Sequence, residues 1–112
     1  MLVVNRFIVP ADDPDFADRA GVALEALAAR PGYVRGELGR AYDDPTCWSL
    51  LTEWESVGAY RRALGGFDVK MHATPLLAQS VDEPSAFERL AHTDASGALV
   101  TAASDRAVDG SR

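Results

Sequence analysis

The chain has 112 residues, of which 47% are hydrophobic and 25% are charged, and this composition is typical of one ordinary domain with a single core. Its formal net charge of -6 repels polyanions, which argues against nucleic acid as a partner. The lone cysteine, Cys47, excludes an internal disulfide and a tetrathiolate metal site, and the apolar run at the N-terminus is too short for a signal peptide or membrane span. We therefore expect a cytoplasmic protein.

The N-terminal third predicts a strand followed by an amphipathic helix. Residues Leu2–Val9 are rich in β-branched and aromatic side chains and stop at a proline, as a strand does. Asp13 is placed to cap a helix with Pro14 at its first position, and apolar residues then recur at helical spacing until "RPG" at residues 30–32. This helix has one apolar face.

The rest of the chain predicts a hairpin, a broken helical segment and a last strand. Tyr33–Tyr42 and Cys47–Trp54 flank the turn-forming "DDPT" and form the hairpin. Ser56 caps a short helix that two glycines interrupt, and Phe67–Ala78 is a further short helical stretch. Ser85–Ala91 is the last strand.

The order βαββαβ predicts an α+β, ferredoxin-like fold: a four-stranded antiparallel sheet with helices on one face. The first strand carries apolar side chains at both odd and even positions, among them Val4 and Ile8 against Val3 and Phe7. Two helices can cover only one face of such a sheet, so the second face is expected to pack against another subunit. The sequence therefore predicts a homodimer.

Residues 1–91 form the predicted domain, and the segment from His92 to Arg112 changes character. It is rich in Ala, Ser, Asp and Gly, and its larger apolar pair is Leu99 and Val100. Such a segment buries too little to offset its ordering entropy, which predicts a flexible tail. The alternative is a segment that docks on the partner subunit through Leu99 and Val100.

Motifs with a known chemistry are absent from the sequence. It contains no glycine-rich phosphate loop, no dinucleotide fingerprint, no HExxH and no Cys or His cluster with metal spacing. Nothing places the serines, aspartates and the two histidines together as a hydrolase site. Composition and spacing thus lead to a small α+β dimer with a possible pocket.

The chain resembles the antibiotic biosynthesis monooxygenase superfamily over residues Met1 to Ala91. The motifs that carry the resemblance are "VVNRFIVP", "RPGYVRGELGR", "DDPTCWSLLTEWESVGAYRRAL" and "VKMHATPLLA", of which "WES" followed by "AY" is the most recognisable. The resemblance implies a dimeric α/β barrel. It also implies either cofactor-independent oxygenation of aromatic polyketides or haem degradation, because the superfamily includes both activities.

The haem-degrading branch has a site of an asparagine, a tryptophan and a histidine. Asn5 and His72 match the first and last, while Ala63 stands where that branch has its tryptophan. The resemblance therefore leaves haem binding through His72 open but puts degradation in doubt.

The polyketide-oxidising branch implies a different set of residues. Trp54 matches the tryptophan of "WES" and Tyr60 the tyrosine of "AY", whereas Leu50 replaces an asparagine and the branch's arginine has no clear counterpart. Each branch is matched in part.

Every candidate also has a purely structural interpretation. Asn5 can be a satisfied polar group in an apolar strand, and Trp54 a core residue whose indole N–H finds a partner. Tyr60 fits an ordinary core stripe of its helix, and His72 can be a surface histidine.

Three functions are consistent with these observations. The first is a cofactor-independent monooxygenase that uses molecular oxygen on a small aromatic, quinone-forming substrate. In it, Trp54 and Tyr60 wall one cavity, Asn5 binds a substrate oxygen and His72 exchanges a proton. The second is a haem-binding or haem-degrading protein, and the third is a non-catalytic dimeric ligand-binding module.

Overall fold

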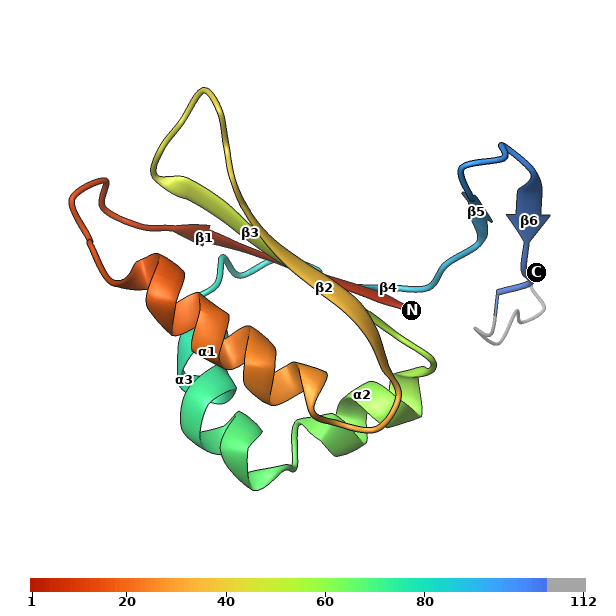
Figure 1. The fold of residues 1–112 in the computed structure, drawn as a ribbon, viewed down its shortest axis with the longest axis horizontal. Helices are drawn as coiled ribbons and strands as arrows, with labels where there is room; N and C mark the ends of the chain where they lie inside the picture. The colour runs from red at the N-terminus through yellow and green to blue at the C-terminus, as the bar shows by residue number, and fades with distance from the viewer. Residues whose placement is uncertain (105–112) are drawn as a thin grey trace.

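The computed structural model of the protein describes residues 1–104, and Figure 1 shows a sheet with its helices on one side. The elements follow in the order β1 (Leu2–Ile8), α1 (Phe16–Ala28), β2 (Tyr33–Arg40), β3 (Cys47–Trp54), α2 (Val57–Ala63), η1 (Val69–Ala73), α3 (Thr74–Leu77), β4 (Ala86–Phe87), β5 (Ala91–Thr93) and β6 (Leu99–Thr101). η1 is a π-helix. The predicted βαββαβ order is confirmed, with α2, η1 and α3 as the broken second crossover.

The main sheet has four strands in the order β2-β3-β1-β4, and every pairing is antiparallel. β1 pairs with β3 along its whole length, from Leu2 opposite Glu53 to Ile8 opposite Cys47. The predicted hairpin is β2 and β3, whose register shifts between Tyr33 and the residues that follow. Alternate residues of each strand therefore face the helices.

The two faces of β1 differ in burial. Val3, Asn5 and Phe7 lie on the face that the helices cover and are buried, whereas Arg6 and Ile8 on the other face are exposed. Exposure of the Ile8 side chain reaches 64%. As predicted, apolar side chains occur on both faces of β1, and the helices of this chain cover one of the two faces.

Aromatic side chains fill the space between the sheet and the helices. The Phe16 ring of α1 lies 5.2 Å from Phe7 and 5.1 Å from Trp48, measured between ring centroids. Other helix residues complete the layer, namely Ala20, Ala23, Leu27, Ala59, Ala63, Val69, Ala73 and Leu76. The alanines among them let the helices approach the sheet closely, and the largest fully buried side chains are Trp54, Phe7 and Phe16.

Capping and one glycine position the second crossover. Ser56 caps α2, as predicted, because its hydroxyl oxygen accepts a hydrogen bond of 3.0 Å from the Ala59 amide. Gly32, in the turn between α1 and β2, has a φ of +88°, and a Cβ there would lie 2.4 Å from the Ala59 Cβ. Only glycine permits both this conformation and this approach of α2 to the turn.

The first helix begins later than the sequence predicts. α1 starts at Phe16 with Asp15 as its N-cap residue, not at Pro14. The Asp13 carboxylate instead accepts a hydrogen bond of 2.9 Å from the Asp15 amide, which makes a side-chain turn ahead of the helix. The Asp13 carboxylate therefore stabilises the turn before α1 and does not cap the helix itself.

The last strand of the sheet is shorter than predicted. β4 comprises Ala86–Phe87, although the Ser85 carbonyl also accepts a hydrogen bond of 2.7 Å from the Val4 amide. Pro84 has no N–H to extend the ladder, which limits the strand at that end. Residues beyond it form a separate hairpin of β5 and β6 that projects from the body (Figure 1).

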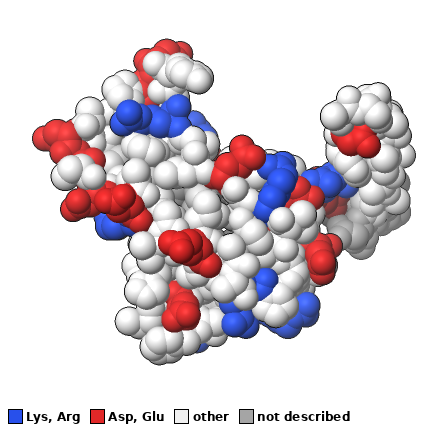
Figure 2. Space-filling view, in the orientation of Figure 1, with Lys and Arg blue, Asp and Glu red and all other residues white. Residues whose placement is uncertain are grey.

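The domain boundary at residue 91 and the flexibility of the tail stay predictions, and residues 105–112 of that tail lie outside the described residues. Acidic and basic side chains are interspersed over the face shown in Figure 2, without a continuous basic patch on that face. In the described part of the chain, no helix combines the length and the hydropathy needed to cross a membrane.

Candidate functional site

A pocket of about 560 Å³ lies beside α2, η1 and α3, and we refer to it as the Tyr60 pocket. Its lining residues are Tyr60, Leu64, Lys70, Thr74, Leu77 and Ala78. All six come from the broken second crossover, whose successive turns place them on one side. The volume is in the range of pockets that hold small organic ligands, and half of the lining is aliphatic.

Three polar side chains that line this pocket have no partner in the described part of the chain. Within residues 1–104, the Tyr60 hydroxyl, the Thr74 hydroxyl and the Lys70 ammonium group take part in no hydrogen bond or ion pair. Burial raises the pKa of Tyr60 above its ordinary value of 10.0, so its phenol is neutral at physiological pH and available as a donor. The pocket thus offers two hydroxyls and one cation to a ligand.

Trp54 lies behind Tyr60 and holds that ring in place. The two ring centroids are 5.5 Å apart, and Tyr33 packs edge-on against the other side of Trp54 at the same distance. The Trp54 indole N–H donates a hydrogen bond of 2.9 Å to the Thr52 hydroxyl, and the side chain is 1% exposed. Trp54 is therefore a satisfied core residue that supports the Tyr60 ring.

Asn5 faces the helices from the middle of β1. The residue is 9% exposed, and its side-chain amide makes no hydrogen bond with any described residue. The Asn5 amide is not among the fully occluded side-chain groups without a partner, of which the described residues have one, Arg30 Nε. The Asn5 amide is therefore still partly accessible to solvent. An unpaired amide in an apolar row is costly unless water or a ligand satisfies it.

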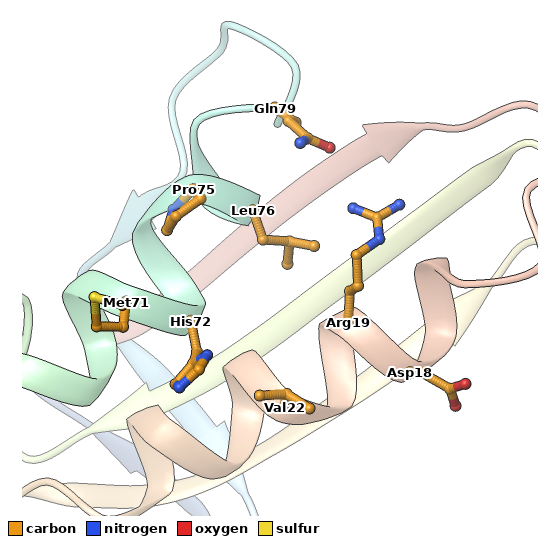
Figure 3. A pocket seen from close by; sticks show the side chains of 8 residues that line it. All are labelled: Asp18, Arg19, Val22, Met71, His72, Pro75, Leu76 and Gln79. Carbon is orange, nitrogen blue, oxygen red and sulfur yellow. The ribbon is translucent and has the colours of Figure 1, made fainter.

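A second pocket, of about 540 Å³, lies between α1 and the η1–α3 segment, and we refer to it as the His72 pocket. Its lining residues are Asp18, Arg19, Val22, Met71, His72, Pro75, Leu76 and Gln79. Figure 3 shows His72 and Val22 directed toward the gap between the helices, while Asp18 points away from it. The Arg19 guanidinium already pairs with Asp13 at 2.9 Å.

The structure brings together two of the four predicted site residues, Trp54 and Tyr60, which are in ring contact. Asn5 shares the covered face of the sheet with Trp54, but it lies opposite Leu50, four β3 residues or about 13 Å along the strand from Trp54. His72 is exposed and lines a different pocket from Tyr60. The expectation that all four surround one cavity is therefore not met by these two pockets.

Sequence reasoning missed Lys70 and Thr74. The two are four residues apart in a stretch predicted to be helical, with Leu77 and Ala78 three and four residues further on. That spacing puts all of them on one helical face, and this shared face is the sequence signal for the group. The described part of the chain has no group of three or more His, Cys, Asp or Glu side chains arranged to hold a metal ion.

Comparison with known proteins gives a family match. The model of the family described as "Antibiotic biosynthesis monooxygenase" matches residues 1–71. No curated protein sequence is significantly similar to the chain.

Several solved structures share the fold. SnoaB from Streptomyces nogalater, described as a cofactor-independent oxygenase, is 32% identical with a TM-score of 0.64, and the match covers 80% of this chain and 94% of SnoaB. A conserved protein from Methanosarcina mazei Go1 has a TM-score of 0.61 at 20% identity, with 76% and 84% of the two chains covered. A protein from Nitrosomonas europaea described as an antibiotic biosynthesis monooxygenase has a TM-score of 0.60 at 17% identity, with coverage of 74% and 87%. The last two show likeness of fold alone.

Proposed function

The chain belongs to the antibiotic biosynthesis monooxygenase family, and from this premise we propose that it is a cofactor-independent monooxygenase of a small aromatic, quinone-forming substrate bound in the Tyr60 pocket. The observation that carries the proposal is the 32% identity with SnoaB, itself described as a cofactor-independent oxygenase, over 94% of the SnoaB chain. The family match and the SnoaB likeness support a monooxygenase-like function. The substrate class is our inference.

The proposed chemistry relies on the substrate as its own electron donor. An aromatic ketone with an acidic ring CH₂ loses a proton to give an enolate, which transfers one electron to O₂. The resulting radical and superoxide combine to a peroxide anion at that carbon, which takes up a proton from water to give the hydroperoxide. Loss of water then leaves a new C=O, so CH₂ and O₂ become C=O and H₂O. The protein must bind the anion, orient its rings and limit the access of water.

The residues near the Tyr60 pocket suit these tasks. The Tyr60 ring, supported by Trp54, offers a wall for a planar ligand, and its neutral phenol is a donor for the enolate oxygen. Asn5, whose amide has no partner among the described residues, lines neither pocket, so its proposed role in binding a second substrate oxygen requires a ligand that extends under the helices. The proposal includes that Asn5, Trp54 and Tyr60 contact or support the same bound substrate.

The proton acceptor predicted from the sequence, His72, lacks support from its position. It lines the other pocket, and the residues that line the Tyr60 pocket include neither an imidazole nor a carboxylate. We therefore assign proton loss to the acidity of the substrate itself, with water as the acceptor. Transfer through His72 would need a ligand that reaches around η1.

Haem is a poor fit to the residues present. In the haem-degrading branch a histidine and a large indole share one site, but His72 and Tyr60 line different pockets and Ala63 is buried in the core. No residue of the Tyr60 pocket is a usual axial ligand with an imidazole or a thiolate. We derive no step through haem.

We further propose that the chain forms a homodimer through the open face of its sheet. Leu2, Val4 and Leu51 lie on that face by their register, with Ile8 and Phe87 exposed to 64% and 47%. Arg6 lies on the same face between Val4 and Ile8, and its charge is paired with Glu83 at 2.7 Å. A self-complementary face of this kind is typical of twofold dimers.

The dimer is tested with Leu51→Asp, which places a charge in the centre of the strip. Light scattering should give the mass of a dimer for the wild-type protein and that of a monomer for the variant. A wild-type protein that is a stable monomer at micromolar concentration contradicts the dimer.

Oxygen uptake tests the enzymatic proposal. Anthrone, which has the required CH₂ opposite a ketone, is mixed with chelator-treated protein, and O₂ consumption and anthraquinone formation are followed against the spontaneous rate. We expect saturable consumption of equal amounts of O₂ and anthrone without any added cofactor. Saturable binding of anthrone with no acceleration would favour the non-catalytic binding module, and no binding would refute the proposed pocket.

A further inference from the structure

Lys70 is the single lysine of the sequence and the one cation in the lining of the Tyr60 pocket. It is the second residue of η1, next to the buried Val69. The turn that buries Val69 and Ala73 in the core leaves Lys70 and Thr74 exposed beside the pocket, so the two polar groups lie one helical turn apart. π-helical turns of this kind are frequent at functional sites.

Lys70 differs from several exposed arginines because it has no acidic partner among residues 1–104. Arg6, Arg19 and Arg35 each form an ion pair with a carboxylate at 2.9 Å or less. Lys70 forms no ion pair within the described residues, and the lining of its pocket contains no carboxylate. Arg40, Arg61 and Arg62 likewise form no ion pair within the described residues, so Lys70 is distinguished by its place in the lining of an apolar pocket.

We propose that the ligand of the Tyr60 pocket is an aromatic anion and that Lys70 selects it by pairing with its charged oxygen. The Thr74 hydroxyl, four residues further along, donates a second hydrogen bond to the same group. Leu64, Leu77 and the Tyr60 ring hold the aromatic part. This inference rests on the proposed function, and it names the ionised form of the substrate as the species that binds.

The geometry favours an anion on electrostatic grounds. Lys70 gives up some hydration when a ligand anion binds, but it has no ion pair with a described residue to break, and the aliphatic walls strengthen the attraction by lowering the local dielectric. A neutral ligand of the same shape would gain the apolar contacts but not the charge-assisted hydrogen bond. Either a carboxylate or an ionised phenol can supply the charge.

The test compares naphthalene derivatives by titration calorimetry at low ionic strength. 2-Naphthoate supplies a carboxylate, 2,4-dinitro-1-naphtholate supplies an ionised phenol, and 2-naphthamide is a neutral ligand of nearly the shape of 2-naphthoate. The variants are Lys70→Met, which keeps the length of the side chain, and Lys70→Arg, which keeps its charge. Arg61→Met is the matched control, because Arg61 is exposed on α2 and does not line the pocket.

We expect at least one anion to bind the wild-type protein about tenfold tighter than the amide, since charge-assisted hydrogen bonds have that strength. Lys70→Met should abolish the preference without weakening binding of the amide. Lys70→Arg should keep most of the preference for the anion, and Arg61→Met should keep all of that preference. The anion that shows the larger preference identifies the carboxylate or the phenolate as the recognised group. Added salt should reduce the preference.

Two failures can be told apart. Equal binding of anions and amide by the wild-type protein, or a preference that survives in Lys70→Met, overturns the role of Lys70 and leaves the proposed pocket standing. Absence of binding by all three ligands, or binding that Tyr60→Ala leaves unchanged in a folded variant, overturns the proposed pocket and the role of Lys70 with it.

Discussion

The Tyr60 and His72 pockets lie on two sides of the same helical segment and have nearly equal volumes, about 560 and 540 Å³. Their chemistry differs. In the Tyr60 pocket one cation and two hydroxyls have no partner among the described residues, whereas in the His72 pocket Arg19 is already paired with Asp13 and Asp18 adds a negative charge. Volume therefore does not distinguish the two pockets, and neither does an unpaired polar group alone, because Asp18, His72 and Gln79 also have no partner among the described residues. The linings differ in their unpaired charge, which is an ammonium group in the Tyr60 pocket and a carboxylate in the His72 pocket.

The largest expected effect comes from Trp54→Ala. Trp54 is 1% exposed and contacts both Tyr33 and Tyr60, so its loss should lower the free energy of unfolding by about 3–5 kcal/mol in a urea titration. It should also release the Tyr60 ring and abolish binding of 2-naphthoate. Trp54→Phe keeps a ring in place and should lose much less of both. A Trp54→Ala variant of unchanged stability would show that the ring contacts are misplaced.

Adjacent leucines sharpen the comparison further. Leu76 is 4% exposed and lines the His72 pocket, while Leu77 is partly buried and lines the Tyr60 pocket. Leu76→Ala should cost about 2–4 kcal/mol of unfolding free energy and spare ligand affinity in the folded protein. Leu77→Ala should cost less stability but weaken 2-naphthoate binding severalfold. The reverse pattern would place the ligand in the His72 pocket.

Tyr60→Phe tests the phenol with a smaller change. The ring contact with Trp54 remains, so stability at neutral pH should change by less than about 1 kcal/mol. Because burial raises the pKa of Tyr60 in the folded state, the stabilisation is complete below the ordinary value of 10.0 and is lost as the pH rises above it. Tyr60→Phe should flatten this alkaline loss. Part of it should persist, since burial also raises the pKa of Tyr33.

The smallest effect is expected from His72→Ala. His72 is exposed, so its loss should change the unfolding free energy by less than about 0.5 kcal/mol. Affinity for 2-naphthoate and the rate of anthrone oxidation should stay at wild-type values. A large fall in rate with unchanged affinity would restore the role of proton acceptor that the sequence predicts for it.

Much of the fold could be predicted because it follows from local patterns. The two-residue period of a strand puts Asn5 on the same side of β1 as Val3 and Phe7, and all three are buried. The serine at position 56 correctly marked the start of α2. The length of β4 could not be predicted in this way, because it depends on which amides can pair with β1 around Pro84.

The site was harder to predict because it depends on rotation about a helix axis. His72 and Lys70 are two residues apart and line opposite pockets. Which of them lines the Tyr60 pocket depends on the π-helical turn of η1 and on the break at residues 65–66. Both change the rotation of the side chains about the helix axis, so the periodicity of a regular α-helix does not predict it. The resemblance supplied His72, whereas Lys70, which we propose binds the ligand, is identified by its place in the lining of the Tyr60 pocket.

A crystal structure of the wild-type protein with 2-naphthoate tests the central claim most directly, because it shows which of the two pockets holds the ligand. The account predicts the naphthalene ring against Tyr60 and Leu77, with its carboxylate within hydrogen-bond distance of the Lys70 ammonium group. A naphthalene ring bound instead between Val22 and His72, with the carboxylate on Arg19, would contradict the account.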